Sequence, residues 1–266
     1  MRRRGFALLA VLWTLATVTV AVGGTLATLR DGARASRNRI LLARGRWAAE
    51  ACLAIAAARW EAGRWSDSAT IDLGRATRCA WHAEDPAARL NLNTADRALL
   101  QRFFISTGMS ADRASALLDS VVAHRRHVPF ASPEQLRDIA DVPDSVLAQL
   151  TVDGPGTVNA NAAAPQVLAA LPGLGPEAVD RIVGRRSSGR PLTSLDALAA
   201  ALSPAGRAAL LAEYAALARL LVFGSAQLEI EAAGWVAIDS TAPRATIDVV
   251  VVPLPSRLAV IRRRLL

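Results

Sequence analysis

The sequence predicts an α+β fold in which a long amino-terminal helix packs on an antiparallel sheet and an all-α domain is inserted between the strands. Residues 6–62 have helical composition, residues 63–90 and 205–266 contain short alternating stretches typical of strands, and residues 91–204 show helical spacing. With 266 residues, of which 52% are hydrophobic and 20% charged, the chain is long enough to bury a core and too apolar to be disordered.

The net charge is confined to the amino-terminal part of the chain. Residues 1–46 contain nine arginines and one acid, whereas residues 47–266 contain 22 arginines and 22 acids, so the formal charge of +8 belongs to the first segment. A neutral body does not attract a polyanion. We therefore expect no nucleic acid among the partners.

Residues 6–29 form an uncharged run of 24 residues. As a helix this run would be about 36 Å long, which is enough to cross the core of a bilayer. It is longer than the apolar part of a signal peptide, and no Ala-x-Ala site precedes Arg30. We expect a transmembrane helix here, continued by a stem helix over residues 30–62 that ends at Gly63.

The stem helix carries an apolar stripe with a spacing of three and four residues. The stripe comprises Ile40, Ala43, Trp47, Cys52, Ile55 and Ala56. Trp47 is expected to contribute to helix packing. Because the stripe is broader than one sheet face would cover, the exposed side near Ile40, Trp47 and Ile55 is predicted to bind partner proteins.

Strands are expected on both sides of the insertion. Residues 66–90 have the pattern of two or three short strands, and residues 203–220 form one more helix. Further strands are predicted at residues 227–231, 234–238, 246–252 and 257–262. Residues 262–264, all arginine, are expected to be solvated.

The insertion at residues 91–204 contains an internal repeat. Asn91-Leu-Asn93 recurs 68 residues later as Asn159-Ala-Asn161. Further matches are Arg125-Arg126 with Arg185-Arg186 and Phe130 with Leu192. The pattern predicts two small helical units, at residues 91–150 and 155–204.

The second unit contains Leu171-Pro-Gly173-Leu-Gly175, which resembles a helix–hairpin–helix motif. In DNA-binding members of that class, the glycine turn offers backbone N–H groups to a phosphate. The same turn also allows two helices to pack closely. The second unit has almost no net charge, and the first unit lacks the double-glycine turn. Both observations favour a role of the turn in helix packing. Gly173 and Gly175 are DNA-binding candidates only under the alternative that the chain is a membrane-anchored DNA receptor.

The first residues resemble the processing site of type IV prepilins and type II secretion pseudopilins. Three arginines precede Gly5 and Phe6, and the apolar helix follows directly. The resemblance implies a leader at residues 1–5, cleavage of the Gly5–Phe6 bond by a prepilin peptidase, and methylation of the new amino group of Phe6.

The fifth residue after that bond is Ala10, where most pilin-like subunits have Glu. The minor pseudopilin K family of type II secretion lacks this Glu, and its members carry Asn-Leu-Asn before a helical insert, as the chain does at Asn91. The chain resembles this family along its whole length. The resemblance implies a pilin-like sheet that residues 63–90 begin and residues 205–266 complete.

The same resemblance implies a subunit at the tip of the pseudopilus, which primes and caps assembly together with I-like and J-like minor pseudopilins. It places the helix in the inner membrane and most of the chain in the periplasm, although six arginines between Arg30 and Arg46 oppose that orientation. A minor pilin of a DNA-uptake pilus is a further alternative.

No cofactor is expected. Members of the family usually hold calcium with a cluster of acids, of which Asp119 is the remnant here, and two arginines follow it closely. Calcium takes roughly six to eight oxygen ligands, and the local sequence does not supply them.

The chain also lacks the sequence motifs of hydrolases, phosphate-binding loops and zinc proteases, so we do not expect an enzyme. The only two cysteines, Cys52 and Cys79, have no neighbouring base. They would form a disulfide only if the fold brings them together in an oxidising compartment, which the sequence does not decide.

Overall fold

The computed structural model describes residues 3–237 and 243–265, with side chains described from Val11 onward. It confirms the predicted α+β fold. The chain divides into two units, each of which is described by itself. The first consists of Met1–His82, Glu231–Asp248 and Arg264–Leu266, and the second of Ala83–Ile230 and Val249–Arg263.

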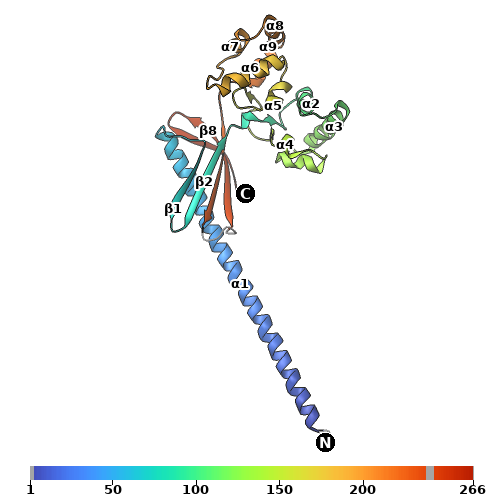
Figure 1. The fold of residues 1–266 in the computed structure, drawn as a ribbon, viewed down its shortest axis with the longest axis vertical. Coiled ribbons are helices and arrows are strands. Elements are labelled where there is room, and N and C mark those ends of the chain that lie inside the picture. The colour runs from blue at the N-terminus through green and yellow to red at the C-terminus, as the bar shows by residue number, and fades with distance from the viewer. Residues whose placement is uncertain (1–2, 238–242, 266) are drawn as a thin grey trace. The chain divides into compact units, whose positions relative to one another are not determined.

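The first unit begins with α1 (Arg3–Glu61), one uninterrupted helix of 59 residues. It ends where Gly63 adopts a φ of 65°, in the left-handed region that favours glycine at the end of a helix. Among the described residues, this is the one helix long and apolar enough to cross a membrane, and its apolar window is not buried by the rest of the chain. The carboxyl-terminal part of α1 lies along the sheet, and the amino-terminal part extends beyond it (Figure 1).

The sheet has five strands in the order β1-β2-β7-β8-β9. Their bounds are β1 (Ser68–Gly74), β2 (Thr77–Glu84), β7 (Leu228–Val236), β8 (Arg244–Leu254) and β9 (Arg257–Leu265). The antiparallel hairpin of β1 and β2 pairs Ile71 with Cys79 and Ala69 with Trp81. Period-two alternation then directs Cys79 and Trp81 to the buried face.

The two strands predicted at residues 227–231 and 234–238 are one continuous strand, β7. Gly234, the predicted first residue of the second of these strands, lies inside β7 at a point where the strand comes very close to α1. A Cβ at Gly234 would lie 2.1 Å from the carbonyl oxygen of Gly45 and 2.4 Å from the backbone nitrogen of Ala49. Ile238 lies outside the described residues.

The second unit contains, besides parts of β7, β8 and β9, a mainly helical domain with one shared apolar core. Its helices are α2 (Arg97–Ser106), α3 (Ala111–His127), α4 (Asp144–Leu147), α5 (Pro165–Ala170), α6 (Pro176–Ser187), α7 (Leu195–Ala200), α8 (Pro204–Ala212) and α9 (Tyr214–Leu220), with 3-10 turns at Pro86–Ala88 and Pro133–Asp138. Helix α2 packs against both α3 and α5, so the two repeats meet there. Phe103 and Phe104 of α2 are fully buried at that contact.

Each repeat is closed by a short parallel strand pair. In the first, β3 (Leu90–Asn91) pairs with β4 (Leu150–Thr151), and in the second, β5 (Val158–Asn159) pairs with β6 (Leu221–Val222). The second repeat therefore extends to Val222. This corrects the predicted boundary at residue 204, and α8 and α9 belong to the helical domain rather than to the sheet that follows.

The physical reason for this error is that helical spacing does not reveal which core covers an apolar face. Leu210 of α8 and Leu217 of α9 are fully buried in the helical core. The single helix expected at residues 203–220 is divided in two at Glu213, which has a φ of −111°.

The repeated asparagines make equivalent hydrogen bonds. Asn93 Oδ1 accepts from the N–H of Phe130 at 2.9 Å, and its Nδ2 donates to the Phe130 carbonyl at 2.9 Å. Asn161 makes the same pair with Leu192, at 3.1 and 2.8 Å. Each asparagine thus connects the start of its repeat by two hydrogen bonds to the loop after a long helix. The role of these asparagines is structural.

The repeated arginines are also equivalent, with a shift in register. Arg125 donates to the carbonyl of Ala95 at 2.8 Å, and Arg186 donates to the carbonyl of Ala163 at 2.6 Å. Arg125 therefore corresponds to Arg186 and not to Arg185. Burial lowers the pKa of Arg125 from its ordinary value, and the group stays charged at neutral pH.

Asp85 joins three segments of the helical domain. Its carboxylate is buried and accepts hydrogen bonds from the Ala87 N–H at 2.8 Å, from Asn159 Nδ2 at 2.7 Å and from the Ser225 hydroxyl at 2.7 Å. The entry to the domain, the start of the second repeat and the exit from the domain are thereby held at one point.

Arg262 is not solvated as expected. Its side chain is 24% exposed and forms ion pairs with Asp153 and Glu229. Glu229 also pairs with Arg89. Sequence reasoning missed this network because the partners are distant in the chain and join only in the folded unit.

Candidate functional site

The stem part of α1 has a buried face made of small residues. Gly45, Ala48, Ala49, Cys52 and Ala56 are buried against the sheet of the first unit. Their spacing of three and four residues places them on one side of the helix. Small side chains there let the helix backbone approach β7 closely.

The predicted apolar stripe is therefore divided between two faces. Trp47, expected in helix packing, is 77% exposed, and Ile40, seven residues earlier on the same side, is 54% exposed. Ile55 is partly buried, between the exposed face and the sheet-facing one. Of the three predicted partner-binding residues, the structure therefore leaves Ile40 and Trp47 on a common exposed face.

A shallow pocket lies beside Trp47. It has a volume of about 300 Å³, and its walls include Arg44 and Trp47 of α1, the end of β1 at Leu73 and Gly74, and Arg75 of the β1–β2 turn. Arg75 and Ala76 both have positive φ, 51° and 57°, as a two-residue hairpin turn requires. This turn was not among the predicted site residues, because its proximity to Trp47 depends on how the sheet lies on the helix.

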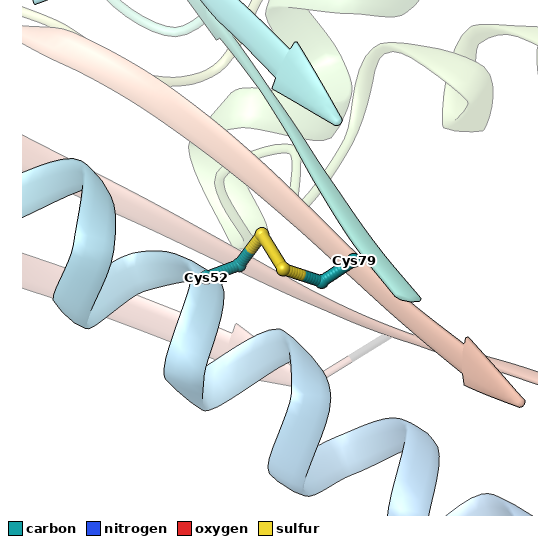
Figure 2. Close-up of a disulfide and its surroundings, with 2 residues drawn as sticks. All are labelled: Cys52 and Cys79. Carbon is teal, nitrogen blue, oxygen red and sulfur yellow. A yellow bond between two sulfur atoms is a disulfide. The ribbon is translucent and has the colours of Figure 1, made fainter. Parts of the chain in front are cut away.

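The sequence left open whether the two cysteines pair, and the structure joins them. Cys52 of α1 and Cys79 of β2 form a disulfide with a Cα–Cα distance of 5.9 Å across a sequence separation of 27 residues (Figure 2). Both residues are fully buried. The bond fastens the stem helix to the sheet covalently, close to the small-residue contact.

The predicted processing residues Gly5 and Phe6 lie in the first turns of α1. The surroundings of Gly5 and the side chains of Phe6 and Ala10 lie outside what the structure describes. Their role therefore stays a prediction.

The glycine turn between α5 and α6 is packed against α8 and its junction with α9. Gly173 has a φ of 73°, and a Cβ placed there would lie 2.9 Å from Glu213 Cβ and 3.2 Å from the carbonyl oxygen of Ala209. Gly175, which precedes α6, has an ordinary φ of −71° and open space around it. Gly173 is therefore required because the turn lies close to α8 and to its junction with α9, in the same domain. This favours the packing interpretation over a DNA contact.

An acid also occupies the first turn of α6. Glu177 accepts hydrogen bonds from the Ser203 N–H and the Ser203 hydroxyl, both at 2.7 Å, and these bonds lower the pKa of Glu177. The carboxylate is therefore charged at neutral pH, and the contact weakens only as the pH falls through the lowered pKa. A negative charge at this helix start opposes the approach of a phosphate.

The difference between the two glycines gives a stability prediction. We expect Gly173→Ala to lower the free energy of unfolding by about 2–4 kcal/mol, because the substitution adds left-handed strain and an overpacked contact. Gly175→Ala is the matched control and should change it by less than about 0.5 kcal/mol. Thermal unfolding followed by circular dichroism measures both, and equal effects of the two substitutions would contradict the packing interpretation.

The residues around Asp119 do not fit a calcium site. Its carboxylate lies 2.8 Å from the guanidinium of Arg97, and its side chain is 69% exposed. Within residues 11–237 and 243–265, no three His, Cys, Asp or Glu side chains gather in a group that would hold a metal ion. An arginine in contact with the one remaining acid repels a divalent cation.

The chain was compared with families of known proteins and with solved structures. A search of family models and a search of curated proteins found no match to this sequence. The structure, however, is similar to GspK in the GspK–GspI–GspJ complex of the type 2 secretion system from enterotoxigenic Escherichia coli, with a TM-score of 0.59 and 14% sequence identity. The match covers 89% of this chain and 98% of GspK.

The chain has the GspK fold. At 14% identity the similarity rests on the arrangement of helices and strands and not on shared side chains. Because the match covers 89% of this chain, the similarity extends over most of the fold and is not confined to one motif.

Proposed function

We propose that the chain is a minor pseudopilin that primes assembly and caps the tip of a type II secretion pseudopilus, for protein export across the outer membrane. The observation that carries the proposal is the match to GspK over 89% of this chain, because that structure is a complex with GspI and GspJ. The apolar helix α1 suits an anchor in the membrane. In this proposal the helical domain is the part that hinders further stacking above the subunit.

The proposed partners are an I-like and a J-like minor pseudopilin. They would bind the exposed face of α1 at Ile40 and Trp47, beside the β1–β2 turn. A tryptophan that is 77% exposed costs little to desolvate and offers a large contact area. Exposed aromatic residues next to a shallow pocket are frequent centres of protein interfaces.

Replacing Trp47 tests this face. We expect Trp47→Glu to weaken binding of the full chain to the two partners by about 30-fold or more, as for a central interface residue. Leu42→Glu is the matched control, because Leu42 is also an exposed apolar residue of α1 but lies about 140° around the helix from Trp47. Co-purification and a binding titration in detergent measure the effect. Equal losses for both variants, or no complex with the unmodified chain, would contradict the proposal.

The proposal includes processing at the Gly5–Phe6 bond. In cells that contain a prepilin peptidase, the mature chain should begin with N-methylated Phe6, and Gly5→Val should leave the leader attached because a branched side chain blocks the approach of the protease. Gly32→Val, on the exposed helix with open space around it, is the control and should be processed normally. Intact-mass measurement distinguishes the forms, and a retained Met1 in the unmodified chain would refute processing.

The disulfide supports the proposed orientation, in which α1 crosses the inner membrane and the body of the chain lies in the periplasm. Disulfides form and persist in oxidising compartments. The buried Cys52–Cys79 bond therefore favours the periplasmic side for the stem part of α1 and for the strand β2, against the distribution of arginines.

A further inference from the structure

A dense group of arginines follows the apolar part of α1. Arg30, Arg34, Arg37, Arg39, Arg44 and Arg46 are all exposed. The one acid between residues 30 and 46 is Asp31, whose carboxylate lies 3.9 Å from Arg34. Both side chains of this pair are more than three-quarters exposed, so water screens the pair and the segment keeps a strong positive field.

The helix determines how far each arginine lies from the end of the apolar segment. At about 1.5 Å per residue, Arg34 lies about 6 Å beyond Arg30 along the axis, and Arg39 lies about 14 Å beyond it. The polar layer of one leaflet is roughly 5–8 Å thick, and electrostatic attraction extends about another 8 Å at physiological salt. The first four arginines are therefore within range of lipid phosphates, whereas Arg44 and Arg46 are about 21–24 Å away.

The four arginines also surround the helix. Successive residues are about 100° apart, so Arg30, Arg34 and Arg37 share one side and Arg39 lies on the opposite side. No part of the chain covers the helix at these positions, where every described residue from 30 to 39 is exposed.

We propose that Arg30, Arg34, Arg37 and Arg39 bind the phosphates of anionic phospholipids at the membrane surface. Guanidinium groups form two parallel hydrogen bonds with a phosphate and retain their charge at all physiological pH values. The inference rests on the proposed transmembrane placement of α1. The contacts hold the subunit at a defined height in the bilayer, and a subunit that leaves the membrane for a fibre has to break them.

The test uses the full chain in nanodiscs of equal parts phosphatidylglycerol and phosphatidylcholine. Lipids retained after transfer to a mild detergent are counted by native mass spectrometry. We expect retained phosphatidylglycerol to exceed phosphatidylcholine by about tenfold or more, since each arginine at the surface strengthens binding by roughly fivefold. The excess should fall as salt is raised.

The variant Arg30→Gln/Arg34→Gln/Arg37→Gln/Arg39→Gln should lose the preference, whereas the control Arg44→Gln/Arg46→Gln should keep it within twofold. Equal retention of the two lipids by the unmodified chain overturns the inference. The inference is also overturned if the four-arginine variant keeps the lipid preference but loses its protein partners. That result would show that the arginines bind an acidic protein surface. A chain that does not insert into the bilayer at all contradicts the proposed function itself, and so the two failures are distinguishable.

Discussion

Gly234→Ala is expected to destabilise the packing of the stem helix on the sheet. A Cβ at this position would lie 2.1 Å from the Gly45 carbonyl oxygen, 2.4 Å from the Ala49 nitrogen and 2.7 Å from Ala48 Cβ. Two of these atoms belong to the backbone of α1, so no side-chain rotation relieves the overlap. We expect the free energy of unfolding to fall by about 3 kcal/mol or more, at the upper end of overpacking effects.

Thermal unfolding of the full chain in detergent measures this effect. For a chain of this size, about 3 kcal/mol corresponds to a lower Tm by roughly 6–12 °C. Gly224→Ala is the matched control, because a Cβ at Gly224 meets no atom within 4 Å. A Gly234→Ala chain as stable as the control would show that α1 does not cross β7 at this point.

Loss of the disulfide is expected to have an effect of similar size. The bond closes a loop across 27 residues, and the chain-entropy relation assigns such a loop about 3–4 kcal/mol of stabilisation. Cys52→Ala/Cys79→Ala should therefore lower the Tm of the full chain by roughly 6–16 °C. Both side chains are fully buried, so the small cavities left behind add to the loss.

A reducing agent provides the control for this prediction. Reduction of the unmodified chain should reproduce most of the loss in Tm, and the double variant should not respond to the reducing agent. Unmodified chain whose Tm is the same with and without reductant would contradict a stabilising disulfide. Chain retained in a reducing cytoplasm should likewise lack the bond, which also tests the proposed orientation.

The internal repeat shows how much of the helical domain could be predicted. The repeat of Asn91-Leu-Asn93 as Asn159-Ala-Asn161 can be recognised in the sequence. The hydrogen bonds that Asn91 and Asn159 accept from the N–H two residues later follow from this local pattern. The end of the second repeat was not visible, because β6 at Leu221–Val222 consists of two residues whose partner is Val158–Asn159. A two-residue strand has no periodicity to detect.

Less of the candidate partner-binding face could be predicted from the sequence. Sequence spacing placed Ile40 and Trp47 on one side of a helix, but it also included Cys52 and Ala56 in the same stripe. The large apolar side chain of Trp47 was expected to pack in the core, whereas the sheet packs on Gly45, Ala48 and Ala49. Where a helix packs closely on a strand, the two backbones leave room only for small side chains between them. Small residues are therefore buried at this contact, and Trp47 is left on the exposed side of the helix.

The sequence by itself determined the features that depend on neighbouring residues: the long apolar helix, the repeated helical pattern, the glycine turn at Gly173 and the confinement of charge to residues 1–46. These features follow from composition and short-range periodicity, which are properties of the chain before it folds. Tertiary structure alone decided the Cys52–Cys79 bond, the Gly45–Gly234 contact, the place of α8 and α9 and the burial of Arg262. Each of these joins residues that are distant in sequence, and their proximity depends on which apolar faces cover one another when the core forms.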